Sequence, residues 1–267
     1  MSMVETFPAI FVGKYSSGKS GKIRSIERWL RKEDNYGYGK YYDEYWKRED
    51  SVDYDRLNMI IKHIKPGKDV LEINCGASLL SKMILEKGAN ITVTDISGVA
   101  LEKAKSRGIQ KTFKIDIDTQ SLPSSFELSK FDIVISNSMI EHYFYPENTI
   151  KEGIKALRDD GKFIVIVPNI GHWRFRLWLL FGRLPYIQDT PSDMLHLRFL
   201  TVHSLKELGK KHGLVVKKVE GHAGLWMKKL YPKLFRVPPM NQIYGLLTII
   251  YPSLFARYML VTFEKKK

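Results

Sequence analysis

Residues 13–20 read GKYSSGKS and match the pattern G-x-x-x-x-G-K-[ST], in which backbone N–H groups and a lysine bind nucleotide phosphates. That chemistry requires a strand before the loop and several parallel strands after it. Only about a dozen residues precede Gly13, and no acidic strand end suited to magnesium follows within the next fifty residues. We therefore interpret this segment as a basic turn. An alternative is that its cations contact an anionic substrate; these are Lys14, Lys19, Lys22 and Arg24.

A second set of candidate residues follows an apolar run, in the segment VLEINCGAS at residues 70–78. The segment supplies Glu72, Asn74, Cys75 and Gly76, and Asp95 follows 23 residues after Glu72. An acid about 20 residues beyond a glycine-bearing turn is suited to bidentate hydrogen bonding of ribose hydroxyls. Because no G-x-G-x-x-G occurs at this turn, a dinucleotide is disfavoured. The spacing predicts a nucleoside-binding site.

Alternating elements must position these residues. Short apolar runs predict strands at 69–73, 90–95, 111–116, 131–136, 161–168, 214–221 and 256–265. Amphipathic runs between them predict helices at 79–88, 97–108, 146–161 and 201–213, and a further helix begins at Ser51. Strands that alternate with helices form a parallel sheet covered on both faces. We therefore expect an α/β, doubly wound, mostly parallel seven-stranded sheet with helical insertions.

The strand ends resemble those of the class I methyltransferases, which use S-adenosyl-L-methionine and release S-adenosyl-L-homocysteine. Their first motif reads hydrophobic-hydrophobic-(Glu/Asp)-hydrophobic-Gly-Cys-Gly-x-Gly, and residues 70–78 follow it in most positions. The resemblance implies that Asp95 binds the ribose and that Ile96 contacts the adenine. The other cofactor contacts that the resemblance implies are Glu72, Asn74, Cys75 and Gly76, then Asp116, Ile117 and Asp118 along the adenine edge, and Ser136 and Asn137 beside the methionine portion.

Two positions depart from this motif, because Asn74 and Ser78 stand where the family has glycine. Asparagine is the residue besides glycine that best tolerates a positive φ, so we expect Asn74 to preserve the turn. Ser78 is expected to cap the next helix, and Cys75 to be a small buried packing residue. The alternative is a degenerate site that binds its cofactor weakly.

A longer resemblance lies further along the chain, in PNIGHWRFR at residues 168–176 and DTPSDMLHL at residues 189–197. Both runs are similar to the MetW-like branch of the same superfamily. That kinship implies the fold and the cofactor, and it leaves the pathway open. It also supports an alternative function, a non-catalytic protein that binds S-adenosylmethionine or S-adenosylhomocysteine as the partner of a biosynthetic enzyme.

Three histidines are candidates for work on a methyl acceptor. His142 follows the fourth predicted strand, where an acceptor is expected, and would remove a proton from it or orient it. His172 and His196 lie in an insertion expected to form the acceptor wall. Some quinone O-methyltransferases have Glu-x-x-Glu-His here and bind a divalent metal; in this chain Ser138 replaces the first carboxylate, so we predict no metal. The alternative for each histidine is a structural role.

The chain divides into an N-terminal extension at 1–50 and a methyltransferase domain at 51–267, with inserts at about 168–200 and 221–254. The extension is rich in tyrosine, and we expect it to fold over the cofactor as a lid. Its lid residues are Tyr36, Tyr38, Tyr42 and Trp46, and Tyr42 is the expected cofactor contact. The alternative is that they pack against the outer helices.

The formal net charge of +14 predicts an anionic partner. No acid occurs between Asp160 and Asp189 or between Glu220 and Glu264, where basic residues alternate with Trp, Phe and Leu. That composition is typical of a helix in a membrane interface or of a groove for an anionic amphiphile; nucleic acid is disfavoured because no RNA-binding module is visible.

With one cysteine and no signal-peptide pattern in residues 1–8, we expect a cytoplasmic protein, peripheral at the inner face of the membrane. The predicted function is methylation, at oxygen, of a small or lipid-linked anionic molecule. A peripheral membrane scaffold is the third alternative.

Overall fold

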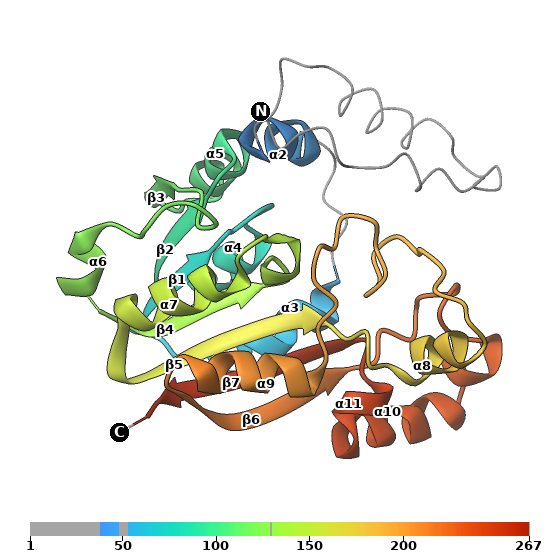
Figure 1. Ribbon diagram of the computed structural model, residues 1–267. Helices are drawn as coiled ribbons and strands as arrows, with labels where there is room; N and C mark the ends of the chain where they lie inside the picture. Colours follow the sequence, from blue (N-terminus) through green and yellow to red (C-terminus); the bar gives the residue numbers. More distant parts are fainter. Residues whose placement is uncertain (1–37, 48–52, 129, 267) are drawn as a thin grey trace, which may run out of the picture.

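The computed structural model of the chain describes residues 38–47, 53–128 and 130–266, and these form a seven-stranded sheet covered by helices (Figure 1). Across the sheet the strands are β3 (Lys111–Lys114), β2 (Asn90–Asp95), β1 (Asp69–Ile73), β4 (Phe131–Asn137), β5 (Leu157–Pro168), β7 (Tyr258–Lys265) and β6 (Leu214–His222). The first five are parallel, and β7 runs antiparallel to both its neighbours. The predicted doubly wound, mostly parallel sheet is confirmed.

Helices cover both faces because successive strand residues point to opposite sides. In β1, Val70 packs into one core and Leu71 into the other. The Val70 core is closed by α3 (Tyr54–Ile61), α4 (Leu79–Glu86) and α5 (Gly98–Ser106). The Leu71 core is closed by α7 (Pro146–Ala156), α9 (Val202–Lys211), α6 (Ser124–Leu128) and part of α2 (Tyr38–Trp46).

Several predicted boundaries are wrong, and each has a local cause. The helix predicted from Ser51 begins at Tyr54, because the side chain of Asp53 accepts a hydrogen bond from the Arg56 N–H and caps it. The helix predicted over 146–161 ends at Ala156, and residues 157–160 extend β5. β3 ends at Lys114, two residues short of Asp116.

The two inserts form one additional lobe at the carboxyl end of β5. It contains α8 (Trp173–Leu180), η2 (Lys233–Arg236), α10 (Met240–Ile250) and α11 (Pro252–Phe255), which lie together in Figure 1. The lobe has its own buried core, formed by Phe175 from the first insert with Met227, Leu230, Tyr231 and Tyr244 from the second. Both inserts are therefore halves of a single packed unit.

A buried ion-pair cluster joins α3 to the last two strands. The guanidinium of Arg257, only 1% exposed, lies 3.6 Å from the Asp53 carboxylate, and His222 Nε2 lies 3.3 Å from it. Burial alone raises the pKa of Asp53, but the hydrogen bond and charge of His222, the charge of Arg257 and the Arg56 N–H outweigh it and lower the pKa to about 2. The ionised carboxylate therefore stabilises the fold.

We expect this cluster to make stability depend on acid pH. Because the folded pKa of Asp53 is depressed from 3.8 to about 2, its contribution is fully present above pH 4 and falls as the pH drops towards 2. The contribution is about 2 kcal/mol at pH 7, of which about 1 kcal/mol is lost by pH 3. Asp53→Asn keeps a good helix cap but removes the charge. Urea unfolding at pH 7 and pH 3 should show a smaller pH dependence in the variant; equal dependence in both proteins contradicts the assignment.

Candidate active site

The site begins where β1 and β2 end side by side. The Cys75 N–H donates to the Thr94 carbonyl at 3.0 Å, and the Gly76 N–H donates to Asp95 Oδ2 at 2.9 Å. The other carboxylate oxygen, Oδ1, accepts from the Ser97 N–H at 2.8 Å. Asp95 thus fastens the turn after β1 to the start of α5, so the two strand tips predicted to share a ligand lie in contact.

The turn after β1 is built on left-handed backbone conformations. Asn74, Gly76 and Ser78 have φ values of 62°, 51° and 58°. The prediction that Asn74 adopts a positive φ and preserves the turn is confirmed, as is the burial of Cys75. The prediction for Ser78 is wrong in part: it stands at the N-cap of α4 but makes no capping bond, because its hydroxyl donates instead to the Gly76 carbonyl.

Buried polar atoms collect at this edge of the sheet without partners. The side-chain oxygens concerned are Glu72 Oε1, Asn74 Oδ1, Ser136 Oγ and Asn137 Oδ1; within the described residues none forms a hydrogen bond of good geometry, although the Asn137 side chain lies close enough to Glu72 to stabilise its charge. A buried acceptor left unpaired costs about 1–3 kcal/mol. Four such atoms at adjacent strand ends therefore fit a ligand that brings donors, such as the ammonium and hydroxyl groups of an amino-acid nucleoside.

Two carboxyl groups at the site have raised pKa values. Burial raises the pKa of Glu72 to about 8, although the Ser81 hydroxyl donates to it at 2.5 Å. Burial also raises the pKa of Asp95 to about 6, although the N–H groups of Ser97 and Gly76 stabilise its charge. Both groups stand in a medium of low polarity, where a hydrogen bond to a ligand is stronger than in water.

Helix α2 of the extension covers this edge. A Cβ on Gly76 would lie 2.6 Å from the Trp46 ring, so the indole lies directly against the turn. Asp43 accepts from the Ser97 hydroxyl at 2.6 Å and from the Val99 N–H at 3.2 Å, which fixes α2 to the start of α5. Tyr42, the expected cofactor contact, is buried in the core below. Tyr36 and the Tyr38 side chain lie outside the described part of the chain.

The segment after β3 runs beside Asp95, because the Ile115 N–H donates to the Asp95 carbonyl at 2.9 Å. The Asp116 carboxylate accepts from the Asp118 N–H and the Thr119 hydroxyl, which builds a turn. Ile117 is buried, and Ile96 is partly buried with its carbonyl near Gly39 of α2. The predicted adenine-edge residues are therefore grouped around the end of β2.

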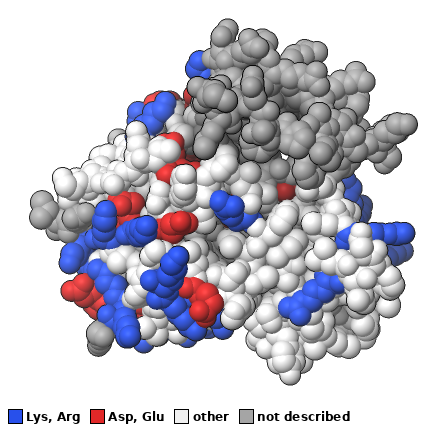
Figure 2. All heavy atoms as spheres, viewed as in Figure 1, with Lys and Arg blue, Asp and Glu red and all other residues white. Residues whose placement is uncertain are grey.

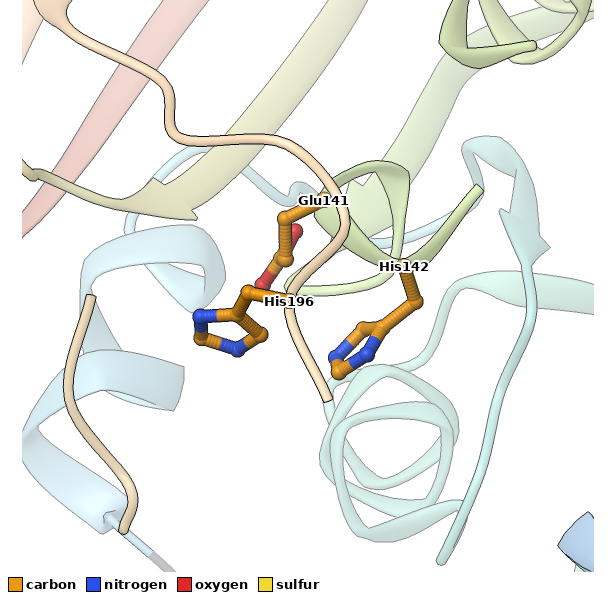
Figure 3. Close-up of side chains that lie close together, drawn as sticks. All are labelled: Glu141, His142 and His196. Atoms are coloured by element: carbon orange, nitrogen blue, oxygen red, sulfur yellow. The ribbon is translucent and has the colours of Figure 1, made fainter. Parts of the chain in front are cut away.

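After β4, the short helix η1 (Ile140–His142) brings His142 to His196 of the first insert, with ring centroids 4.8 Å apart. Figure 3 shows both rings beside the Glu141 carboxylate. His142 Nδ1 donates to the Leu195 carbonyl at 3.0 Å, and His196 Nδ1 donates to the Pro191 carbonyl at 3.1 Å. The insert is held here, since the Leu197 and Arg198 N–H groups both donate to the Glu141 carbonyl at 2.9 Å.

Both histidines of this pair are neutral at physiological pH. Burial and the neighbouring His196 lower the pKa of His142 to about 3, and burial also lowers the pKa of His196. Each Nδ1 carries the proton that its carbonyl partner requires, so each Nε2 keeps a free lone pair. No role was predicted for Glu141. The feature of the sequence that could have indicated one is its position next to His142, shortly after a buried strand.

The structure places His172, the third predicted histidine, away from this pair. Its ring caps α8 and lies fully buried in the insert lobe, with Nε2 3.1 Å from the Tyr231 hydroxyl and 3.0 Å from the Tyr244 hydroxyl. Burial lowers the pKa of His172 to about 3. The expectation that it contacts an acceptor does not fit this position, because Nδ1 accepts from the Arg174 N–H and only Nε2, which faces the two tyrosines, joins the first insert to the second.

The strand order is that of the class I S-adenosylmethionine-dependent methyltransferase superfamily, and the comparisons with known proteins place the chain in it. Within it the chain belongs to the family of the methionine biosynthesis protein MetW, whose family model matches residues 54–236. A TehB-like methyltransferase from Corynebacterium glutamicum has the same fold, with a TM-score of 0.52 at 14% identity over 87% of this chain and 100% of that one.

Among curated proteins, the chain is similar to a ubiquinone biosynthesis O-methyltransferase of Idiomarina loihiensis, at 31% identity over 44% of this chain and 51% of that protein. It is 27% identical to a probable S-adenosylmethionine-dependent methyltransferase of Mycolicibacterium smegmatis, over 67% of this chain and 63% of that protein. The chain thus spans only about half to two thirds of the length of these relatives.

The contact between Trp46 and Gly76 can be tested by a double-mutant cycle. Gly76→Ala should destabilise the protein by about 1–3 kcal/mol through overpacking, and by a further 1 kcal/mol or so through its positive φ. Trp46→Ala removes the clash, so the two changes should couple by about 1 kcal/mol or more in urea unfolding. Gly67→Ala is the control, because φ there is +73° and nothing lies within 4 Å; it should not couple to Trp46.

Proposed function

We propose that the protein transfers a methyl group from S-adenosyl-L-methionine to an oxygen of a small or lipid-linked anionic acceptor. The observation that carries this proposal is the edge formed by Asp95, Gly76 and the unpartnered acceptors at the ends of β1 and β4. Membership of the superfamily supports the cofactor, and an O-methyltransferase among the relatives supports the acceptor atom.

When bound, S-adenosylmethionine supplies an electrophilic methyl group on its sulfonium. Methyl transfer is an in-line displacement, so the chain's task is to align the acceptor and exclude water. Asp95 is suited to accept from the ribose hydroxyls, and Glu72, Asn74 and Asn137 are placed to bind the amino-acid portion. Trp46 and the rest of α2 exclude water above them. His142 lies in η1, shortly after the neighbouring strand β4, and is placed to orient a hydroxyl acceptor.

The cofactor assignment predicts the behaviour of Asp95→Asn. Loss of a charge-assisted hydrogen bond costs about 1.5–3 kcal/mol, so affinity for S-adenosylhomocysteine should fall about 10–100-fold in titration calorimetry. Asp159→Asn is the matched control, because its carboxylate is highly exposed and lies near the start of β5, at the end of the strand opposite the site. Unchanged affinity in Asp95→Asn, with native circular dichroism, means that the ribose assignment is wrong.

The non-catalytic alternative makes a different prediction for the same protein. It expects the same tight binding of S-adenosylhomocysteine but no transfer of a labelled methyl group to any small-molecule or lipid extract. A labelled methyl group that appears in such an extract contradicts the non-catalytic alternative.

The insert lobe supports an amphiphilic acceptor at a membrane surface. The lobe exposes large apolar side chains on two of its helices, which are Leu179 and Leu180 of α8, with Phe181 directly after it, and Leu246, Ile249 and Ile250 of α10. Such a patch on a protein surface marks an interaction site. In Figure 2 the corresponding lobe at the lower right is white and blue. No helix in the described ranges is long and apolar enough to cross a bilayer.

The same lobe also exposes basic residues. Arg176, Arg183, Lys228, Lys229 and Lys233 are exposed, and none forms an ion pair with a carboxylate among the described residues. Unpaired cations around exposed Leu and Ile side chains are complementary to anionic lipid headgroups over acyl chains. We infer that the lobe docks at an anionic membrane surface and receives its acceptor there.

Two exposed aliphatic side chains of the lobe provide a test of this inference. Leu180 is 77% exposed and Ile249 is 74% exposed, so Leu180→Asp and Ile249→Asp should leave the fold intact. Each change removes about 1.5–3 kcal/mol of apolar burial in the interface and should lower binding to vesicles of anionic lipid at least tenfold in flotation. Val215→Asp on β6, also exposed, is the control. If all three variants float like the wild type, the lobe does not dock.

A further inference from the structure

The carboxylate of Glu141 is buried in a way that the fold alone does not explain. Glu141 is 1% exposed, and neither Oε1 nor Oε2 accepts a hydrogen bond from another residue in the described part of the chain. Burial raises the pKa of Glu141 to about 8, so the side chain is a neutral acid at pH 7 when nothing is bound, and each of its unpaired buried oxygens still costs about 1–3 kcal/mol. The cation of Arg56 lies in the neighbourhood, but its NH1 group donates to the Ser138 hydroxyl at 2.8 Å.

Two histidine nitrogens face the same space. Because Nδ1 of His142 and Nδ1 of His196 each donate to a backbone carbonyl, the lone pair of each ring lies on Nε2. Neither Nε2 has a hydrogen-bond partner among the described residues. A histidine whose other nitrogen donates to a carbonyl is the arrangement that protein metal ligands adopt, since this bond fixes the tautomer and the ring orientation.

We propose that Glu141, His142 and His196 bind a divalent transition-metal ion. One ligand atom from each residue lies within 4.8 Å of the others, and Figure 3 shows the three side chains converging from η1 and the first insert. Two imidazole nitrogens and one carboxylate oxygen suit Zn²⁺ or Fe²⁺, and Co²⁺ as a probe. Metal–ligand bonds of about 2.0–2.2 Å place tetrahedral ligand atoms about 3.5 Å apart. The three ligand atoms would therefore move about an ångström closer together when the ion binds.

The proposal departs from the sequence-based expectation that no metal binds here. That prediction rested on Ser138, which stands where a first carboxylate would be and whose hydroxyl instead accepts from Arg56. His196, from the insert, supplies the third ligand in its place. No short sequence motif contains the set, because His196 lies 54 residues after His142.

Two consequences follow from the position of the site. First, three protein ligands leave a coordination position open, and the partial exposure of both histidines gives access to it. If the proposed O-methylation is right, an acceptor oxygen would occupy that position and would lose its proton more easily. Second, the ion would fasten the first insert to the end of β4, so its binding should stabilise the folded chain.

The proposal is tested by metal binding itself. Purified full-length protein, stripped with chelator and dialysed against Zn²⁺ or Co²⁺, should retain about one ion per chain by mass spectrometry. The Co²⁺ form should show visible absorption bands typical of four ligands. The melting temperature should rise by several degrees with Zn²⁺. Glu141→Gln and His196→Ala should each lower Zn²⁺ affinity at least tenfold. His203→Ala, on the exposed side of α9, is the control and should bind like the wild type.

Either of two results overturns the proposal: a wild-type chain that retains no ion, or a His196→Ala chain that retains as much Zn²⁺ as the wild type. Circular dichroism of the variants in the absence of metal separates a lost ligand from a lost fold. Binding of S-adenosylhomocysteine is measured separately. If S-adenosylhomocysteine binds and Zn²⁺ does not, the metal site is wrong and the proposed function stands. If Zn²⁺ binds and S-adenosylhomocysteine does not, the metal site stands and the proposed function is wrong.

Discussion

The carboxylate of Asp95 is the contact on which the candidate site depends. Its two oxygens accept from the turn after β1 and from the start of α5, so one side chain sets the separation of two strand ends. Asp43 of α2 accepts a hydrogen bond from Ser97, at the same start of α5. The helix that covers the site is therefore attached to the segment that Asp95 holds in place.

Much of this arrangement could be predicted from the sequence. The apolar runs gave the strands to within a few residues, because burial on both faces leaves little room for polar side chains in β1, β4 and β5. Asn74 could be assigned a positive φ from its residue type. The helices predicted from Ser97 and Thr201 begin one residue later, and both residues cap their helix by accepting a backbone N–H. These are local properties, which short windows of sequence contain.

What could not be predicted depends on contacts between distant segments. His142 lies beside His196 only because the first insert folds back over η1. No periodicity in the sequence predicts that contact. The role of His172 was misjudged for the same reason: its partners Tyr231 and Tyr244 belong to the other insert. Glu141 was overlooked because a carboxylate directly after a strand usually faces solvent, whereas here the returning insert encloses it.

Hydrogen bonds to the imidazole ring of His172 join the two inserts, and this contact limits how the sequences of the family can change. Since His172 joins Tyr231 and Tyr244 in a core of its own, neither half of the lobe has a complete interior without the other. A substitution that reshapes one half must be accommodated by the other half. Changes in acceptor preference are therefore expected to arise as paired exchanges across the two segments, while the nucleoside edge, which shares no residue with that core, is free to stay the same.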